Sequence, residues 1–129
     1  MLEMLRVGVD TVGAPPIAPV DEPIDLTHLA RMTLGDVSLE HEVLRLFDRQ
    51  ATMLIARMQG AEPSLVAASA HTIKGSARGI GAWRIARDAE TVEMAAACAG
   101  AAELDLAVAR LIASVDEAKA AIAHRLRAF

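Results

Sequence analysis

Apolar residues recur at spacings of three and four along two long segments of this 129-residue chain. Such spacing places them on one face of an α-helix, because successive residues lie about 100° apart around the helix axis. The first segment carries Leu39, Val43, Leu46, Phe47, Leu54, Ile55 and Met58. The second carries Leu104, Val108, Leu111, Val115, Ala118, Ile122 and Leu126. We therefore expect a core built from the apolar faces of helices.

Glycines, prolines and short polar residues divide the chain into five expected helices. The first helix is expected from a cap at Asp25 to an end at Leu34, and the second from a cap at Ser38 to an end at Gly60. The third starts at Pro63 and is broken at Gly79 and Gly81. The fourth runs from Trp83 to a cap at Gly100, and the final turn of the last helix holds His124, Arg125 and Arg127. Short connections make neighbouring helices antiparallel. The expected fold is all-α, an up-down-up-down four-helix bundle with a short extra N-terminal helix.

Composition and breakers set the expected domain limits. Residues 1–23 hold two glycines and four prolines, which favours a flexible leader, and residues 24–129 form the expected bundle domain.

A formal net charge of −4 argues against nucleic-acid binding. The single cysteine, Cys98, excludes an internal disulfide and suits a reducing cytoplasm. With no apolar run of membrane-spanning length and no signal peptide, we expect a cytoplasmic monomer without membrane contact.

One stretch, residues 70–82, carries the candidate chemistry. On the third expected helix, His71 lies opposite Ser69, Ile73 and Ser76, so its imidazole should face solvent. Its neighbours one turn away are Ala67, Ala68, Lys74 and Gly75. The other histidines, His28, His41 and His124, lie on three different helices without thiolate or carboxylate partners, so no metal site is expected.

An exposed imidazole can act as a nucleophile, since histidine side chains titrate close to neutrality. Lys74 disfavours a second positive charge beside the ring and could pair with phosphoryl oxygens after transfer. Gly75 costs roughly 1 kcal/mol relative to Ala inside a helix, but it gives a partner protein clearance to approach His71. Taken singly, each residue has an ordinary explanation: an exposed histidine without function, a solvated lysine, and a glycine that admits a neighbouring helix. Their combination at fixed spacing favours function.

The pattern His71-x-x-Lys74-Gly75-Ser76-Ala77, followed by Gly81-Ala82 and Val92-Glu93, resembles the histidine-containing phosphotransfer (HPt) domains of multistep phosphorelays. Leu44 and Phe47 are similar to the leucine and phenylalanine that this family carries on its long second helix. Gly79 departs from the family pattern, in which that position is often Asn or Ser.

The resemblance implies that His71 accepts a phosphoryl group from the aspartate of one receiver domain and passes it to another. The expected partners are receiver domains of hybrid histidine kinases and response regulators, and Mg²⁺ is expected on the receiver, with no cofactor on this chain. No phosphate-binding loop or ATP-binding glycine motif is present, so we expect a carrier and not an enzyme. The expected docking residues are Ser64, Ala67, Ala68 and Arg78, with Arg84 and Arg87 on the next helix.

Two other functions remain compatible with the sequence. One is a helical scaffold or inhibitor that docks on a histidine kinase or receiver without carrying phosphate, although such a protein has no need of the imidazole. The other is a fragment of a larger chemotaxis-type or hybrid kinase. Since the chain begins with Met1 and contains no catalytic domain, we expect a separate protein.

Overall fold

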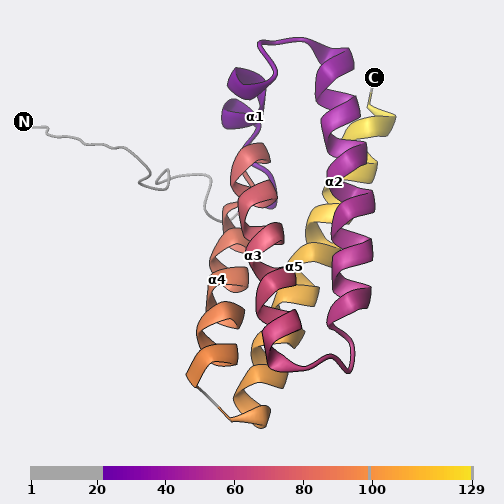
Figure 1. Cartoon of the computed structure of the whole chain (residues 1–129). Helices are drawn as coiled ribbons and strands as arrows, with labels where there is room; N and C mark the ends of the chain where they lie inside the picture. The colour runs from indigo at the N-terminus through magenta and orange to yellow at the C-terminus, as the bar shows by residue number, and fades with distance from the viewer. Residues whose placement is uncertain (1–21, 99, 129) are drawn as a thin grey trace, which may run out of the picture.

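The computed structural model describes residues 22–98 and 100–128, and this part of the chain is helical, without strands (Figure 1). The helices are α1 (Leu26–Met32), α2 (Val37–Met58), α3 (Pro63–Ile80), α4 (Trp83–Cys98) and α5 (Ala101–Arg127). Helix α2 packs on α3, α3 on α4, α4 on α5, and α5 packs back on α2, while α1 contacts α3. The all-α prediction is confirmed. Apart from Glu22 and Pro23, the predicted leader lies outside the described residues.

Aspartates cap the first two helices. The Asp25 side chain accepts a hydrogen bond from the His28 backbone N–H at 3.1 Å, as expected for an N-cap. The cap of α2 is Asp36, which accepts from the Leu39 backbone N–H at 3.1 Å. The prediction of Ser38 as this cap was wrong, because Asp36 follows the turn directly and starts the helix earlier. Likewise α1 ends at Met32, two residues before the expected end.

The glycines differ in what they do at helix ends. Gly81 ends α3 with a left-handed φ of 81°, whereas Gly79 lies inside the helix, so the predicted break at Gly79 was wrong. A helical glycine weakens a helix without ending it, while a positive φ reverses the chain direction. Gly100, predicted as the C-cap of α4, is instead the N-cap of α5.

The buried face of α2 is rotated relative to the predicted stripe. Leu39 and Leu46 are 39% and 53% exposed, which corrects their expected place in the core. The buried residues of this helix are Glu40, Leu44, Phe47, Ala51, Leu54 and Met58. The buried face of α2 includes Ala51 and the ion-paired Glu40, so the positions of large apolar residues alone misplaced the face.

Helices α2 and α5 are also joined by a charged pair. Arg125 donates to both carboxylate oxygens of the buried Glu40, at 2.8 and 3.2 Å. The hydrogen bond to Glu40 raises the pKa of the Arg125 guanidinium, although burial opposes the shift. Arg125 was expected only to lie in the final turn of its own helix, but the structure shows that it also connects this helix to α2.

The corner between α3 and α4 is fixed by the residues that precede α1. The backbone N–H of Asp25 donates to the Gly81 carbonyl at 2.9 Å, and Trp83 Nε1 donates to Asp25 Oδ2 at 3.0 Å. A Cβ atom at position 81 would lie only 3.0 Å from the Asp25 Cβ and carbonyl oxygen. This close approach holds the C-terminal end of α3, and with it the helix that carries His71.

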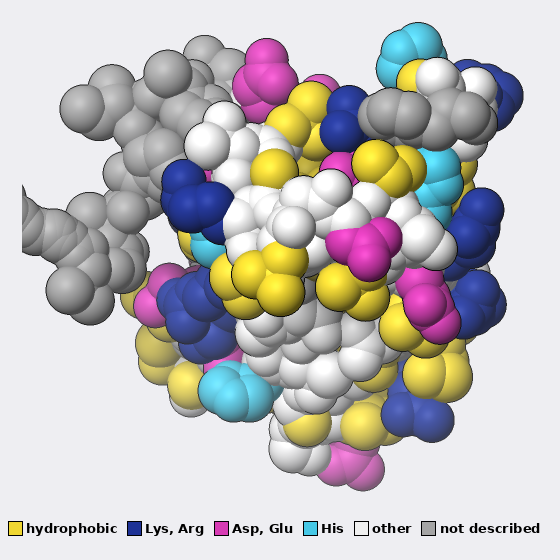
Figure 2. Space-filling view, turned by 90° about the horizontal axis from the view of Figure 1, so that it is seen from above, with side chains coloured by type: hydrophobic (Ala, Val, Ile, Leu, Met, Phe, Trp, Pro, Cys, Tyr) yellow, Lys and Arg dark blue, Asp and Glu magenta, His cyan; other side chains and the backbone are white. Residues whose placement is uncertain are grey.

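Exposed apolar side chains gather at the end of the molecule where α1 meets α2 (Figure 2). Leu34 is the most exposed of them at 88%, and its φ of 56° is left-handed. Because this conformation costs an L-residue about 1–2 kcal/mol, we expect Leu34→Gly to raise the free energy of unfolding by about 1 kcal/mol in urea titrations. The matched change Leu106→Gly, within α5, should lower it by a similar amount. A loss of stability in Leu34→Gly would contradict the expectation.

Candidate functional site

His71 lies on the face of α3 that points away from the core. Its side chain is 70% exposed, whereas Ser69, Ala70 and Ile73 on either side of it in the sequence are buried. The predicted exposure is therefore confirmed. A large partner can reach this ring without any rearrangement of the bundle.

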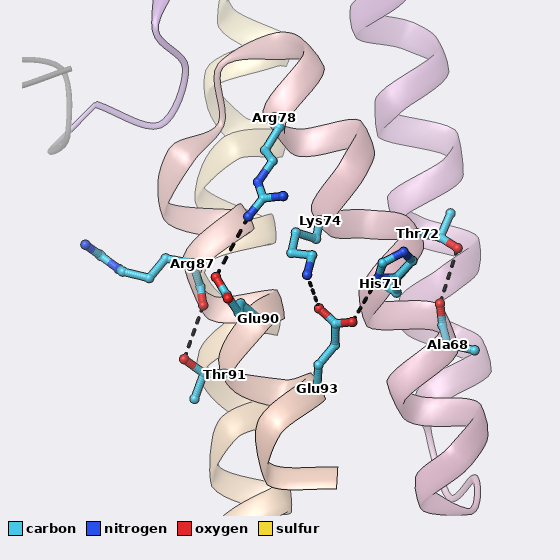
Figure 3. A network of polar contacts seen from close by, with 9 residues as sticks. All are labelled: Ala68, His71, Thr72, Lys74, Arg78, Arg87, Glu90, Thr91 and Glu93. Carbon is cyan, nitrogen blue, oxygen red and sulfur yellow. Dashed lines mark hydrogen bonds and ion pairs between the residues drawn. The ribbon is translucent and has the colours of Figure 1, made fainter. Parts of the chain in front are cut away.

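The His71 ring is held from one side by a carboxylate on α4. His71 Nδ1 lies 2.9 Å from Glu93 Oε2, and Lys74 Nζ lies 2.6 Å from Glu93 Oε1 (Figure 3). One carboxylate of α4 thus bridges two side chains of α3 that are one turn apart. Lys74 and Glu93 are only 15% and 23% exposed, so this part of the site is partly shielded from water.

The contact with the Glu93 carboxylate determines which nitrogen of the His71 ring is available to a partner. An ionised carboxylate only accepts hydrogen bonds, so Nδ1 must carry the proton that Glu93 receives. In the neutral imidazole the lone pair then resides on Nε2. The arrangement therefore presents a nucleophilic nitrogen at Nε2 and places a negative charge behind the ring.

Glu93 remains ionised over a wide pH range. Burial by itself raises the pKa of its carboxyl, but the hydrogen bonds from Lys74 and His71 lower it, and the net pKa lies below its ordinary value of 4.5. The carboxylate is therefore available as an acceptor at neutral pH.

Gly75 leaves open space beside the ring. A Cβ atom built at this position meets no other atom within 4 Å. Internal packing does not require a glycine there, and a glycine inside a helix costs roughly 1 kcal/mol relative to Ala. Contacts within the described chain therefore do not explain why this position is a glycine.

The structure brings most of the expected docking residues to the face that carries His71. Ser64, Ala68 and Arg78 are exposed on α3, and Ala67 is half-buried there. Arg87 is exposed on α4 and points away from His71 (Figure 3). Arg84 is not brought to this face, because its guanidinium contacts Glu117 of α5.

A groove of about 470 Å³ opens where α1, α2 and α3 meet. Ser76 and Gly79 contribute to it from α3, and Ser76 donates to Gln50 Oε1 across it at 2.6 Å. The remaining lining is mostly apolar: Leu29, Met32, Val43, Leu46, Phe47 and Ile80, with Thr33. The groove adds apolar surface beyond the C-terminal end of the His71 face.

The described residues contain no group of three His, Cys, Asp or Glu side chains arranged to hold a metal ion. Within the same residues, none of the helices combines the length and apolar character needed to cross a membrane.

A protein-family comparison matches residues 42–127 to the Hpt domain. The chain belongs to the Hpt domain family. This match confirms the family that the sequence motif suggested. Hpt domains act in histidine phosphotransfer in phosphorelay signalling and interact with receiver domains. The matched range holds His71, Lys74, Gly75 and Glu93, whereas α1 precedes it. Searches of curated proteins and of solved structures find no match.

The contact of Glu93 with His71 and Lys74 was missed by reasoning from the Hpt motif alone. A signal for it is present in the sequence, because the corner between α3 and α4 includes Ala82. His71 precedes Ala82 by 11 residues and Glu93 follows it by 11. Residues equally far from the turn of two antiparallel helices lie at the same level, so the spacing places this carboxylate beside the histidine.

Proposed function

We propose that this Hpt domain is a phosphorelay intermediate. His71 accepts a phosphoryl group from the aspartate of one receiver domain and passes it to the aspartate of another response-regulator receiver. The observation that carries the proposal is the exposed imidazole of His71, whose Nδ1 is held by Glu93 so that Nε2 faces outward. A scaffold that carries no phosphate has no use for this arrangement.

The transfer balances without any further reactant. The Nε2 lone pair of His71 attacks the phosphorus of the aspartyl phosphate, an N–P bond forms, and the P–O bond to the aspartate breaks. The aspartate leaves as a carboxylate and the ring becomes positively charged, with its Nδ1 proton still bonded to Glu93. The negative charge of Glu93 stabilises this cation. Attack by the aspartate of a second receiver reverses these steps and regenerates His71.

Lys74 and Gly75 support this chemistry in different ways. Lys74 Nζ has three N–H donors, and the Glu93 contact at 2.6 Å uses one of them, so others remain to stabilise the phosphoryl oxygens. Gly75 keeps space open for the receiver, which docks on the face of α3 formed by Ser64, Ala67, Ala68 and Arg78. The receiver supplies the Mg²⁺.

We further propose that residues 24–129 form a monomeric, up-down-up-down four-helix domain that acts in the cytoplasm without kinase activity. Support comes from the two- to four-residue connections between the long helices and from the ring of contacts that they make. The lone thiol of Cys98 suits a reducing compartment.

The proposed function is tested by incubating the chain with receiver domains that carry labelled phosphate on their aspartate. We expect label on this chain that is lost in acid and stable in base, as for phosphohistidine. A second, unlabelled receiver should then remove it. If no receiver of the same cell labels the chain, the proposed function is wrong.

A bulky side chain at position 75 should block the receiver and spare the fold. Because a Cβ atom there meets nothing within 4 Å, Gly75→Gln should raise the free energy of unfolding by up to about 1 kcal/mol through helix propensity. Transfer from a receiver should fall about tenfold or more, since clearance near the reacting atoms is lost. Ala109→Gln, on the exposed side of α5, is the matched control and should leave transfer unchanged. Equal transfer in the two variants would remove clearance as the role of Gly75.

A further inference from the structure

A second ion pair joins α3 to α4 beside the bridge made by Glu93. Arg78 Nη2 lies 3.8 Å from Glu90 Oε1, and both side chains are 54% exposed. Figure 3 shows this pair on the same seam between the helices as the contact of Lys74 with Glu93. Each cation of α3 on this seam thus faces one carboxylate of α4.

The two ion pairs differ in how firmly they are held. Lys74 and Glu93 approach to 2.6 Å and are largely shielded from water. The Arg78–Glu90 distance of 3.8 Å exceeds that of a hydrogen bond, and both groups face solvent. Exposed pairs of this kind form and break at little cost, because water solvates the separated charges well. Arg78 can therefore exchange Glu90 for a group of another protein.

Arg78 is placed to act on whatever covers His71. Arg78 follows His71 by seven positions, which is about two helical turns, so the side chains leave α3 about 20° apart and about 10 Å from each other along the axis. This separation is about one Debye length at 0.1 M salt. A receiver brings the negative charge of the phosphoryl group on its aspartate to this face, and Arg78 attracts this charge while Glu90 repels it.

We propose that Glu90 is a specificity-determining residue, which sets how fast different receivers reach His71 by offsetting the charge of Arg78. The inference rests on the proposed function. A receiver docks quickly when it presents a carboxylate to Arg78 and no acidic group to Glu90. A receiver with acidic groups opposite both residues is slowed by Glu90. Selection by repulsion is an established route to specificity, and charges at the rim of an interface change association rates more than affinity.

The test measures the second-order rate of phosphoryl transfer to this chain from a set of receiver domains charged with acetyl phosphate. At about 0.05 M salt we expect Glu90→Gln to raise the rate about two- to fivefold, most for the slowest receiver, and at about 1 M salt to leave it unchanged. Arg78→Gln should lower the rate by a similar factor. In the Arg78→Gln background the gain from Glu90→Gln should be smaller, because only the direct repulsion between Glu90 and the receiver is then removed.

Two controls separate docking from chemistry and from net charge. Phosphoramidate, a small donor that needs no docking surface, should label His71 at rates that differ far less between the variants than the receiver rates do. Glu103→Gln removes the same charge from α5 and should leave the rate unchanged. The inference is overturned by equal or slower transfer in Glu90→Gln, by an equal gain in Glu103→Gln, or by a gain that is just as large in the Arg78→Gln background. If phosphoramidate labels the wild-type chain but no receiver does, the proposed function itself is wrong, and this inference is wrong with it.

Discussion

His71→Gln should abolish the acid-labile, base-stable label, whether the phosphate comes from a receiver domain or from phosphoramidate. A glutamine amide has no lone pair on nitrogen that can form an N–P bond. The fold should not change, because the His71 side chain is 70% exposed and its contact is with Glu93 at the surface of the bundle. Circular dichroism and the urea midpoint should match those of the wild-type chain, within about 0.5 kcal/mol in the free energy of unfolding.

His124→Gln is the matched control for this experiment. His124 is also exposed, but it lies in the last turn of α5, away from Glu93 and Lys74. Its replacement should leave labelling by phosphoramidate and by receivers intact. Label that survives in His71→Gln, or that disappears in His124→Gln, would place the phosphorylated residue elsewhere and reject His71 as the carrier.

The helices could be predicted from the sequence because their signals are local. Periodic apolar residues, Asp25 at the start of α1 and Pro63 at the start of α3 each act within one or two turns of chain. The errors arise where the decision depends on packing between helices. Leu46 appears apolar and suitably spaced, yet it is 53% exposed, since the α2 face that meets the other helices is centred on Phe47 and Ala51.

The candidate site likewise contains residues that could be predicted from one helix and a contact that depends on the packing of two helices. The exposure of His71 follows from the rotation of one helix, and Lys74 and Gly75 lie within one turn of it. Glu93 belongs to another helix, so its contact with His71 depends on where the chain reverses. That position depends in turn on Gly81, which the sequence marked as one of two possible breaks; only the packing of Asp25 against Gly81 distinguishes it from Gly79.

Glu93→Gln should slow phosphorylation of His71 about tenfold to a hundredfold, the range known for loss of a carboxylate that orients a metal-binding histidine. The amide can donate as well as accept, so it no longer enforces the proton on Nδ1, and it carries no charge to stabilise the cationic ring. The ¹⁵N chemical shifts of the His71 ring report the tautomer directly. We expect mainly Nδ1–H in the wild-type chain and a mixture in the variant. Glu93→Asp keeps the charge and should recover part of the rate.

The pH dependence of stability tests the same carboxylate independently of phosphate transfer. Since the folded-state pKa of Glu93 is lowered by Lys74 and His71 despite burial, its contribution to stability is fully present above the unfolded value of about 4.5. It is lost as the pH falls through the lower folded-state pKa. The difference in unfolding free energy between the wild-type chain and Glu93→Gln should therefore be largest near neutrality and shrink below pH 4.5. A difference that is constant down to pH 3, together with an unchanged tautomer, would mean that Glu93 neither binds these partners in solution nor orients His71.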